Sequence, residues 1–157
     1  MEDVFLLNPY KGIKIVNSPN VLIRNVYGQP LKVGITVDYC CDICRIENVH
    51  WNLYFTGLDT PLTRWFRENS TAFEFGRTDW QYCTNLFSYG YNKCFRMYKA
   101  PDHPIEGEAG GGPPNGSFVT CSADACNYGV DVEDCSVFGI NFTTSMFFHF
   151  QSHIEWG

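Results

Sequence analysis

The feature that most constrains the fold is a short pattern that recurs along the chain. Its clearest copy is Gly34-Ile35-Thr36-Val37, a small residue followed by apolar, polar and apolar residues. This alternation has a period of two and is typical of a half-buried β-strand. Five further copies share the same plan and begin at Gly12, Ala72, Cys94, Gly129 and Gly139.

The copies are spaced as in a repeat protein. Twenty-two residues separate Gly12 from Gly34, and the same number separates Ala72 from Cys94. A repeat of this length indicates a solenoid, in which each unit buries its apolar face only by stacking on its neighbours. Because the units are short strands with Asn, Asp and Gly at their corners, the sequence predicts an all-β parallel β-helix. Two insertions interrupt the repeat, at about 52–67 and 99–116. The first is predicted to be a loop or a short helix, because Asp59-Thr60-Pro61-Leu62 resembles a helix start with Pro near its first turn, and the second is predicted to be a loop.

The second halves of the units share an asparagine. Asn25, Asn48 and Asn85 occupy one position of the aligned units and are each followed by Val or Leu. Equivalent residues of a parallel β-helix stack at the strand spacing of about 4.8 Å. We therefore expect these three side chains to form an asparagine ladder, in which each amide hydrogen-bonds the next and supports a bent corner.

These motifs carry a family resemblance. The run from Gly34 to Trp51, together with Arg77-Thr78-Asp79-Trp80 and Ser122-Ala123-Asp124, resembles the pectate-lyase superfamily. More narrowly, it is similar to the glycosyl hydrolase family 28-related proteins, over about residues 10–148. The resemblance implies a right-handed parallel β-helix, and it implies a polysaccharide as the partner.

Catalysis on a polysaccharide would need carboxylates. Glycoside hydrolysis uses one carboxylic acid to protonate the leaving oxygen and a second carboxylate to activate water or to attack. Asp42 and Asp79 occupy aligned corner positions, so we expect them to stack about 5 Å apart on neighbouring units. Asp38 and Glu47 follow them as candidates. Two alternatives remain for the pair, namely a calcium site, as in lyases of the superfamily, or corner residues that bond backbone amides.

The catalytic motifs of the resembled family are incomplete in this chain. Polygalacturonase-like enzymes carry Asn-Thr-Asp, Asp-Asp, Gly-His-Gly and Arg-Ile-Lys motifs. This chain has Arg77-Thr78-Asp79 near the first and Arg45-Ile46-Glu47 near the last, and it lacks the other two. The family's catalytic set therefore cannot be carried over to this chain. The resemblance implies a glycoside hydrolase or polysaccharide lyase acting on a pectin-like or other glycan. The alternative is a non-catalytic carbohydrate-binding or structural module, such as a virion-spike-like β-helix.

Candidate substrate-binding residues gather around the first insertion. Aromatic rings stack on sugar faces, and arginine can form a paired hydrogen bond with a uronate carboxylate. The predicted binding residues are Trp51, Tyr54, Arg64, Trp65, Arg67 and Arg77. The alternative is that these rings pack against the wall of the solenoid.

Composition limits the other partners. The net charge of −6 argues against nucleic acid, whose binding needs clustered Lys and Arg. No apolar run reaches transmembrane length, so no membrane is expected. The chain is predicted to be a single domain over residues 1–157 and a piece of a longer β-helix, which could self-associate through open ends. Residues 1–7 lack the pattern of a signal peptide, and an extracellular location is expected for the full-length protein.

Overall fold

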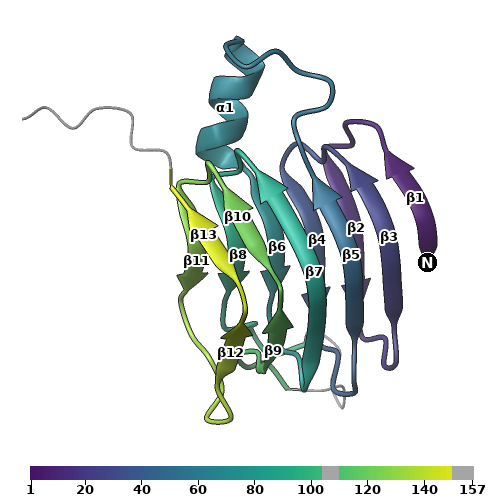
Figure 1. Cartoon of the computed structure of the whole chain (residues 1–157). Coiled ribbons are helices and arrows are strands. Elements are labelled where there is room, and N and C mark those ends of the chain that lie inside the picture. Colours follow the sequence, from purple (N-terminus) through teal and green to yellow (C-terminus); the bar gives the residue numbers. More distant parts are fainter. Residues whose placement is uncertain (104–109, 150–157) are drawn as a thin grey trace, which may run out of the picture.

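The fold consists of two sheets whose named strands all pair in parallel, as a computed structural model describes it for residues 1–103 and 110–149 (Figure 1). The eight-stranded sheet contains β1 (Glu2–Leu6), β3 (Leu22–Gly28), β5 (Arg45–Trp51), β7 (Gln81–Tyr89), β9 (Gly116–Val119), β10 (Ser122–Asp124), β12 (Ile140–Thr143) and β13 (Met146–Phe148). The five-stranded sheet contains β2 (Lys11–Val16), β4 (Val33–Asp38), β6 (Thr71–Phe75), β8 (Lys93–Met97) and β11 (Tyr128–Val132). The predicted all-β class is therefore confirmed.

Through its first half the chain alternates between the two sheets. The five-stranded sheet runs in the order β2-β4-β6-β8-β11, and the other sheet runs β1-β3-β5-β7-β10-β13. Five of the six sequence copies become the successive strands of the five-stranded sheet. The sixth, at Gly139, belongs to the other sheet, because β12 pairs with β9. The copy at Gly139 has the same alternation as the five others, so the alternation alone does not show which sheet a strand joins.

Apolar side chains from both sheets meet between them. The register aligns Ile35, Phe73 and Phe95 on the five-stranded sheet, and the last two rings stack at 5.2 Å. On the facing sheet Phe118 stacks on Phe142 at 4.7 Å, and it meets Phe95 edge-on at 5.8 Å. Burying each such ring contributes about 1.5–3 kcal/mol, so these columns hold the two sheets together.

A column of residues with left-handed backbone crosses the eight-stranded sheet. Its members have φ between 49° and 56° and are neighbours by strand register: Asp3, Asn25, Asn48, Asn85, Thr120 and Thr144. The Asn48 amide donates to Asn25 Oδ1 at 2.9 Å, and the Asn85 amide donates to Asn48 Oδ1 at 3.0 Å. The predicted asparagine ladder is confirmed. It bends each strand, so that Ile46 and Val49, three residues apart, both face the core.

The first insertion contains the helix α1 (Pro61–Asn69), which lies beyond the ends of the strands (Figure 1). Thr60 is its N-cap, and the Thr60 hydroxyl accepts a hydrogen bond from the Thr63 amide at 3.1 Å. Phe66 anchors the helix against Tyr91, with ring centroids 4.5 Å apart. No helix in the described part of the chain is long and apolar enough to cross a bilayer.

The second insertion connects β8 to β9. In its described part, an antiparallel bridge joins Ala100 to Gly112, and each backbone amide bonds the carbonyl of the other residue. The rest of the predicted 99–116 insertion, residues 104–109, lies outside the described residues.

Candidate functional site

The first of the predicted acids, Asp38, holds a corner of the fold. This aspartate is buried at the end of β4. Its Oδ1 accepts from the backbone amides of Tyr39 at 2.9 Å and Arg77 at 3.0 Å, and its Oδ2 accepts from the Tyr98 hydroxyl at 2.9 Å. Both oxygens are therefore engaged in holding a corner, the role that short polar residues commonly take at turns.

The stacking predicted for Asp42 and Asp79 stays a prediction. The chain pairs Cys40 with Thr78 before the corner and Arg45 with Tyr82 after it, so the register shifts by one residue within the corner that holds the two acids. Asp79 forms an ion pair with Arg77 at 3.1 Å. Asp42 is exposed, and the described residues show no hydrogen bond or ion pair to it.

Glu47 lies apart from the other acids. It occupies the outer side of β5, where the register places it between Arg24 of β3 and Thr84 of β7. The structure thus distributes the four predicted acids over two sheets and the corners between them.

The predicted binding residues are also separated. Trp51 is fully buried and stacks on Phe73 at 6.2 Å, so it belongs to the core and no sugar can stack on it. Tyr54 is exposed and lies beside Phe5, with ring centroids 5.9 Å apart. Arg64 is exposed and pairs with Asp59 within the insertion.

The other three predicted binding residues lie elsewhere. Trp65, on α1, stacks on Tyr10 at 6.3 Å and lies under the Lys32 ammonium at 5.8 Å. The Nε of Arg67 is buried without a hydrogen-bond partner. Arg77 lies between two acids, donating its backbone amide to Asp38 and its guanidinium to Asp79.

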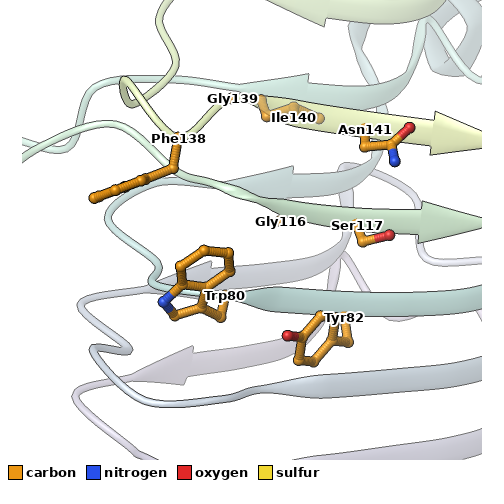
Figure 2. A pocket seen from close by; sticks show the side chains of 8 residues that line it. All are labelled: Trp80, Tyr82, Gly116, Ser117, Phe138, Gly139, Ile140 and Asn141. Atoms are coloured by element: carbon orange, nitrogen blue, oxygen red, sulfur yellow. The ribbon is translucent and has the colours of Figure 1, made fainter.

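A different set of side chains surrounds a hollow on the eight-stranded sheet (Figure 2). This aromatic hollow has a volume of about 290 Å³ and is lined by Trp80, Tyr82, Gly116, Ser117, Phe138, Gly139, Ile140 and Asn141. The Trp80 and Phe138 rings lie 5.7 Å apart at an angle of 37°. Three neighbouring strands, β7, β9 and β12, supply the rest of the lining.

Strand register explains how these side chains come together. Tyr82, Ser117 and Asn141 are direct neighbours on β7, β9 and β12, although they are far apart in sequence. Neighbouring strands lie about 4.8 Å apart, so the three side chains form a row across the sheet. The row offers a phenol, an alcohol and an amide beside the two rings.

Trp80 is held in an unusual backbone conformation. Its φ is 57°, which is rare for a bulky residue and marks a strained position. Buried Asn115 holds it there, because the Asn115 Oδ1 accepts from the Trp80 backbone amide at 2.8 Å. The same Asn115 side chain donates to Asp79 at 3.4 Å. Half of the Trp80 surface, 50%, remains exposed despite this fixed position.

Among the residues that the structure describes, no charged side chain lines the aromatic hollow. The Arg77–Asp79 ion pair directly precedes Trp80 in the chain, and its two charges offset each other. An uncharged hollow with rings and hydrogen-bonding groups suits a neutral ligand that has both an apolar face and hydroxyl groups.

A second hollow, on the five-stranded sheet, contains carboxylates. Asp38 and Glu74 both line this carboxylate hollow, whose volume is about 150 Å³. Glu74 accepts from the Thr36 hydroxyl at 2.7 Å and lies 3.7 Å from Arg96. Burial and the neighbouring Asp38 raise the pKa of Tyr98 above its ordinary value. Both Asp38 oxygens and one Glu74 oxygen already accept hydrogen bonds.

Sequence reasoning missed the residues of the aromatic hollow. Trp80 was visible in the Arg77–Trp80 run, where a large ring follows an acid at a corner that the pattern makes polar. That mismatch was the available signal. Phe138 and Asn141 carried no such signal, since only the pairing of β12 with β9 brings them beside Trp80.

Comparison of the chain with protein-family models, curated proteins and solved structures finds no match. The resemblance to the pectate-lyase superfamily therefore stays a prediction, carried by the motifs alone.

Proposed function

We propose that this chain is a right-handed parallel β-helix that binds polysaccharide without cleaving it, through the aromatic hollow. The alternation of parallel strands between two sheets and the asparagine ladder support the β-helix. Each unit of such a fold presents the outer side of one strand, so a row of side chains along the axis can follow an extended glycan.

The observation that carries the binding proposal is the presentation of Trp80. A tryptophan with a left-handed φ costs about 1–3 kcal/mol of backbone strain, and the buried Asn115 maintains it. The ring nevertheless stays half exposed beside Phe138. A strained, exposed and fixed ring is pre-organised for a ligand, because little conformational freedom is lost on binding.

The lining favours a neutral glycan over a pectin. Recognition of a uronate would use arginine or lysine, and neither is found among the described residues that line the aromatic hollow. The chain's net charge of −6 would also repel a polyanion.

Cleavage of a glycan at the carboxylate hollow is the second candidate function. The observation that favours it is that Asp38 and Glu74 line one hollow, as an acid and base pair would. Against it, both Asp38 oxygens are occupied by donors from Tyr39, Arg77 and Tyr98. Calcium would enter only in this second function, if the reaction were an elimination.

The test is depletion of the protein from solution by insoluble cellulose, xylan, chitin and pectin. We expect at least one neutral polysaccharide to retain the chain. The Trp80→Ala variant should lose at least about tenfold in affinity, because the ring supplies most of the apolar contact. Trp65→Ala is the matched control, since Trp65 is also partly exposed but lies on α1, and it should bind like the wild type.

Two outcomes would overturn the binding proposal. One is equal retention of folded Trp80→Ala and wild type, and the other is no retention by any polysaccharide. Release of reducing ends, or of unsaturated sugars that need Ca²⁺ and vanish with EDTA, would instead support the second function. In that case Glu74→Gln should abolish release while Trp80→Ala leaves the chemical step unchanged.

A further inference from the structure

Besides the two hollows, the eight-stranded sheet has a groove. It lies across the column of left-handed residues from the aromatic hollow. This His50 groove is lined by Tyr27, Asn48, Val49, His50, Asn85 and Phe87 and has a volume of about 290 Å³. It lies on β3, β5 and β7, whereas the aromatic hollow lies on β7, β9 and β12. The strand β7 contributes to both, with Tyr82 before Asn85 and Phe87 after it.

Aromatic side chains form the walls of the His50 groove. Register places Tyr27, His50 and Phe87 side by side on three neighbouring strands. The His50 ring meets Phe87 edge-on at 4.7 Å and Tyr27 at 6.4 Å. All three side chains are half-buried, so each is fixed by its neighbours and keeps one surface open to solvent.

Hydrogen-bonding groups lie between these walls. The asparagine ladder ends at Asn85, whose amide donates to Asn48 and whose exposed Oδ1 accepts no described hydrogen bond. The Tyr27 hydroxyl accepts from Asn48 at 3.0 Å, which leaves its own proton free to donate. One acceptor and one donor therefore face a space bounded by rings.

His50 adds a third polar group. Its Nδ1 lies 3.4 Å from the Tyr54 hydroxyl, and burial lowers the pKa of the imidazole. Since the ring is neutral near pH 7, it makes the groove polar without adding a charge. The described lining thus matches the chemistry of the aromatic hollow, which also has rings and uncharged polar groups.

We propose that the His50 groove is a second saccharide subsite, so that one chain holds a glycan at two places on the same sheet. This inference rests on the proposed function, because it takes its ligand class from there. Two weak subsites that engage one glycan raise the apparent affinity well above that of either alone, through the effective concentration of the second contact.

The experiment is an NMR titration of the 18.0 kDa chain with cellohexaose, xylohexaose, chitohexaose and hexagalacturonate. The Trp80 indole N–H reports on the aromatic hollow, and the His50 ring C–H reports on the groove. We expect one hexasaccharide to shift both signals. In Phe87→Ala the affinity measured from the His50 signal should fall by about two- to tenfold, while the Trp80 signal still shifts.

Two further variants keep the test decisive if Phe87→Ala fails to fold. Tyr27→Phe removes only the hydroxyl and should weaken the response of His50. Tyr128→Ala removes an exposed ring from the outer side of the five-stranded sheet, and both responses should survive it.

The outcomes separate the two proposals. A Trp80 shift without any His50 shift, in a folded protein, overturns the second subsite and leaves the proposed function standing. A His50 shift alone overturns binding at the aromatic hollow and supports the groove. Silence of both signals with all four hexasaccharides overturns both proposals.

Discussion

The two halves of the left-handed column make the same backbone bend with different residue types. In the first half, Asn25, Asn48 and Asn85 take the left-handed φ, and β3, β5 and β7 each run unbroken through the bend. In the second half, Thr120 and Thr144 take nearly the same φ, with values of 53° and 49°. There the strand is interrupted, so that β9 and β10 are separate, as are β12 and β13.

The difference follows from side-chain chemistry. Asparagine tolerates the left-handed region, and its amide both donates to one neighbour and accepts from the next. Threonine is β-branched and fits this region poorly, and its hydroxyl makes one weak contact, 3.3 Å between the two Thr Oγ1 atoms. The backbone position is therefore dictated by the bend, whereas the residue type decides whether the strand continues through it.

Breaking the ladder at its centre should have the largest effect. In Asn48→Ala the side-chain bonds to Asn25, Tyr27 and Asn85 are lost, and alanine must adopt a φ of 50°. Together these changes should lower the free energy of unfolding by about 2–4 kcal/mol. Urea unfolding measures this loss as a lower midpoint with an unchanged slope.

A matched control comes from the other sheet. Thr36→Ala also removes a side-chain hydrogen bond between neighbouring strands, the one to Glu74, but without a left-handed backbone. It should cost about 1 kcal/mol or less. Equal losses in the two variants would contradict the role assigned to the left-handed column.

Replacing a threonine of the second half by asparagine, as in the first half, should stabilise the fold. The gain should be smaller than the loss in Asn48→Ala. Thr120→Asn relieves the strain of a β-branched residue at φ 53° and extends the ladder beyond Asn85, its register neighbour. The free energy of unfolding should rise by about 1 kcal/mol. The measurement is the shift of the urea midpoint, with Thr120→Ala as the control that loses the hydroxyl without gaining an amide. A destabilised Thr120→Asn would show that threonine is preferred for a reason other than the bend.

The smallest expected effect is the pH dependence of stability that comes from His50, which lies on β5 in the first half. Burial lowers the pKa of His50 below its usual value of 6.5, so the unfolded chain binds a proton at a pH where the folded chain does not. The contribution of neutral His50 to the free energy of unfolding is therefore full above pH 6.5. It is lost as the pH falls below that value toward the pKa of His50 in the folded chain. Thermal unfolding across this range should show the decline, and His50→Gln should flatten it. A variant that declines like the wild type would assign the decline to other groups.

The regular parts of this molecule could be predicted from the sequence. The alternation around Ile35 predicted strands, the shared asparagines predicted the ladder, and Thr60-Pro61 predicted the start of a helix. Each of these depends on a local or repeating property, namely side-chain period, backbone tolerance or capping. The same reasoning does not reach the corner that holds Asp42 and Asp79, because the register shifts by one residue between the strand pairs on its two sides.

The candidate site was decided by contacts that no local pattern encodes. An alternating strand has an inner and an outer side whichever sheet it joins, so the sequence determined the β-strands and their buried faces. Only tertiary pairing decided that β12 lies beside β9, which brings Phe138 and Asn141 to Trp80, and that Trp51 is enclosed by Phe73. The physical reason is that strand alternation is fixed by the backbone, whereas the neighbours of an exposed side chain depend on which strands pair and in which register.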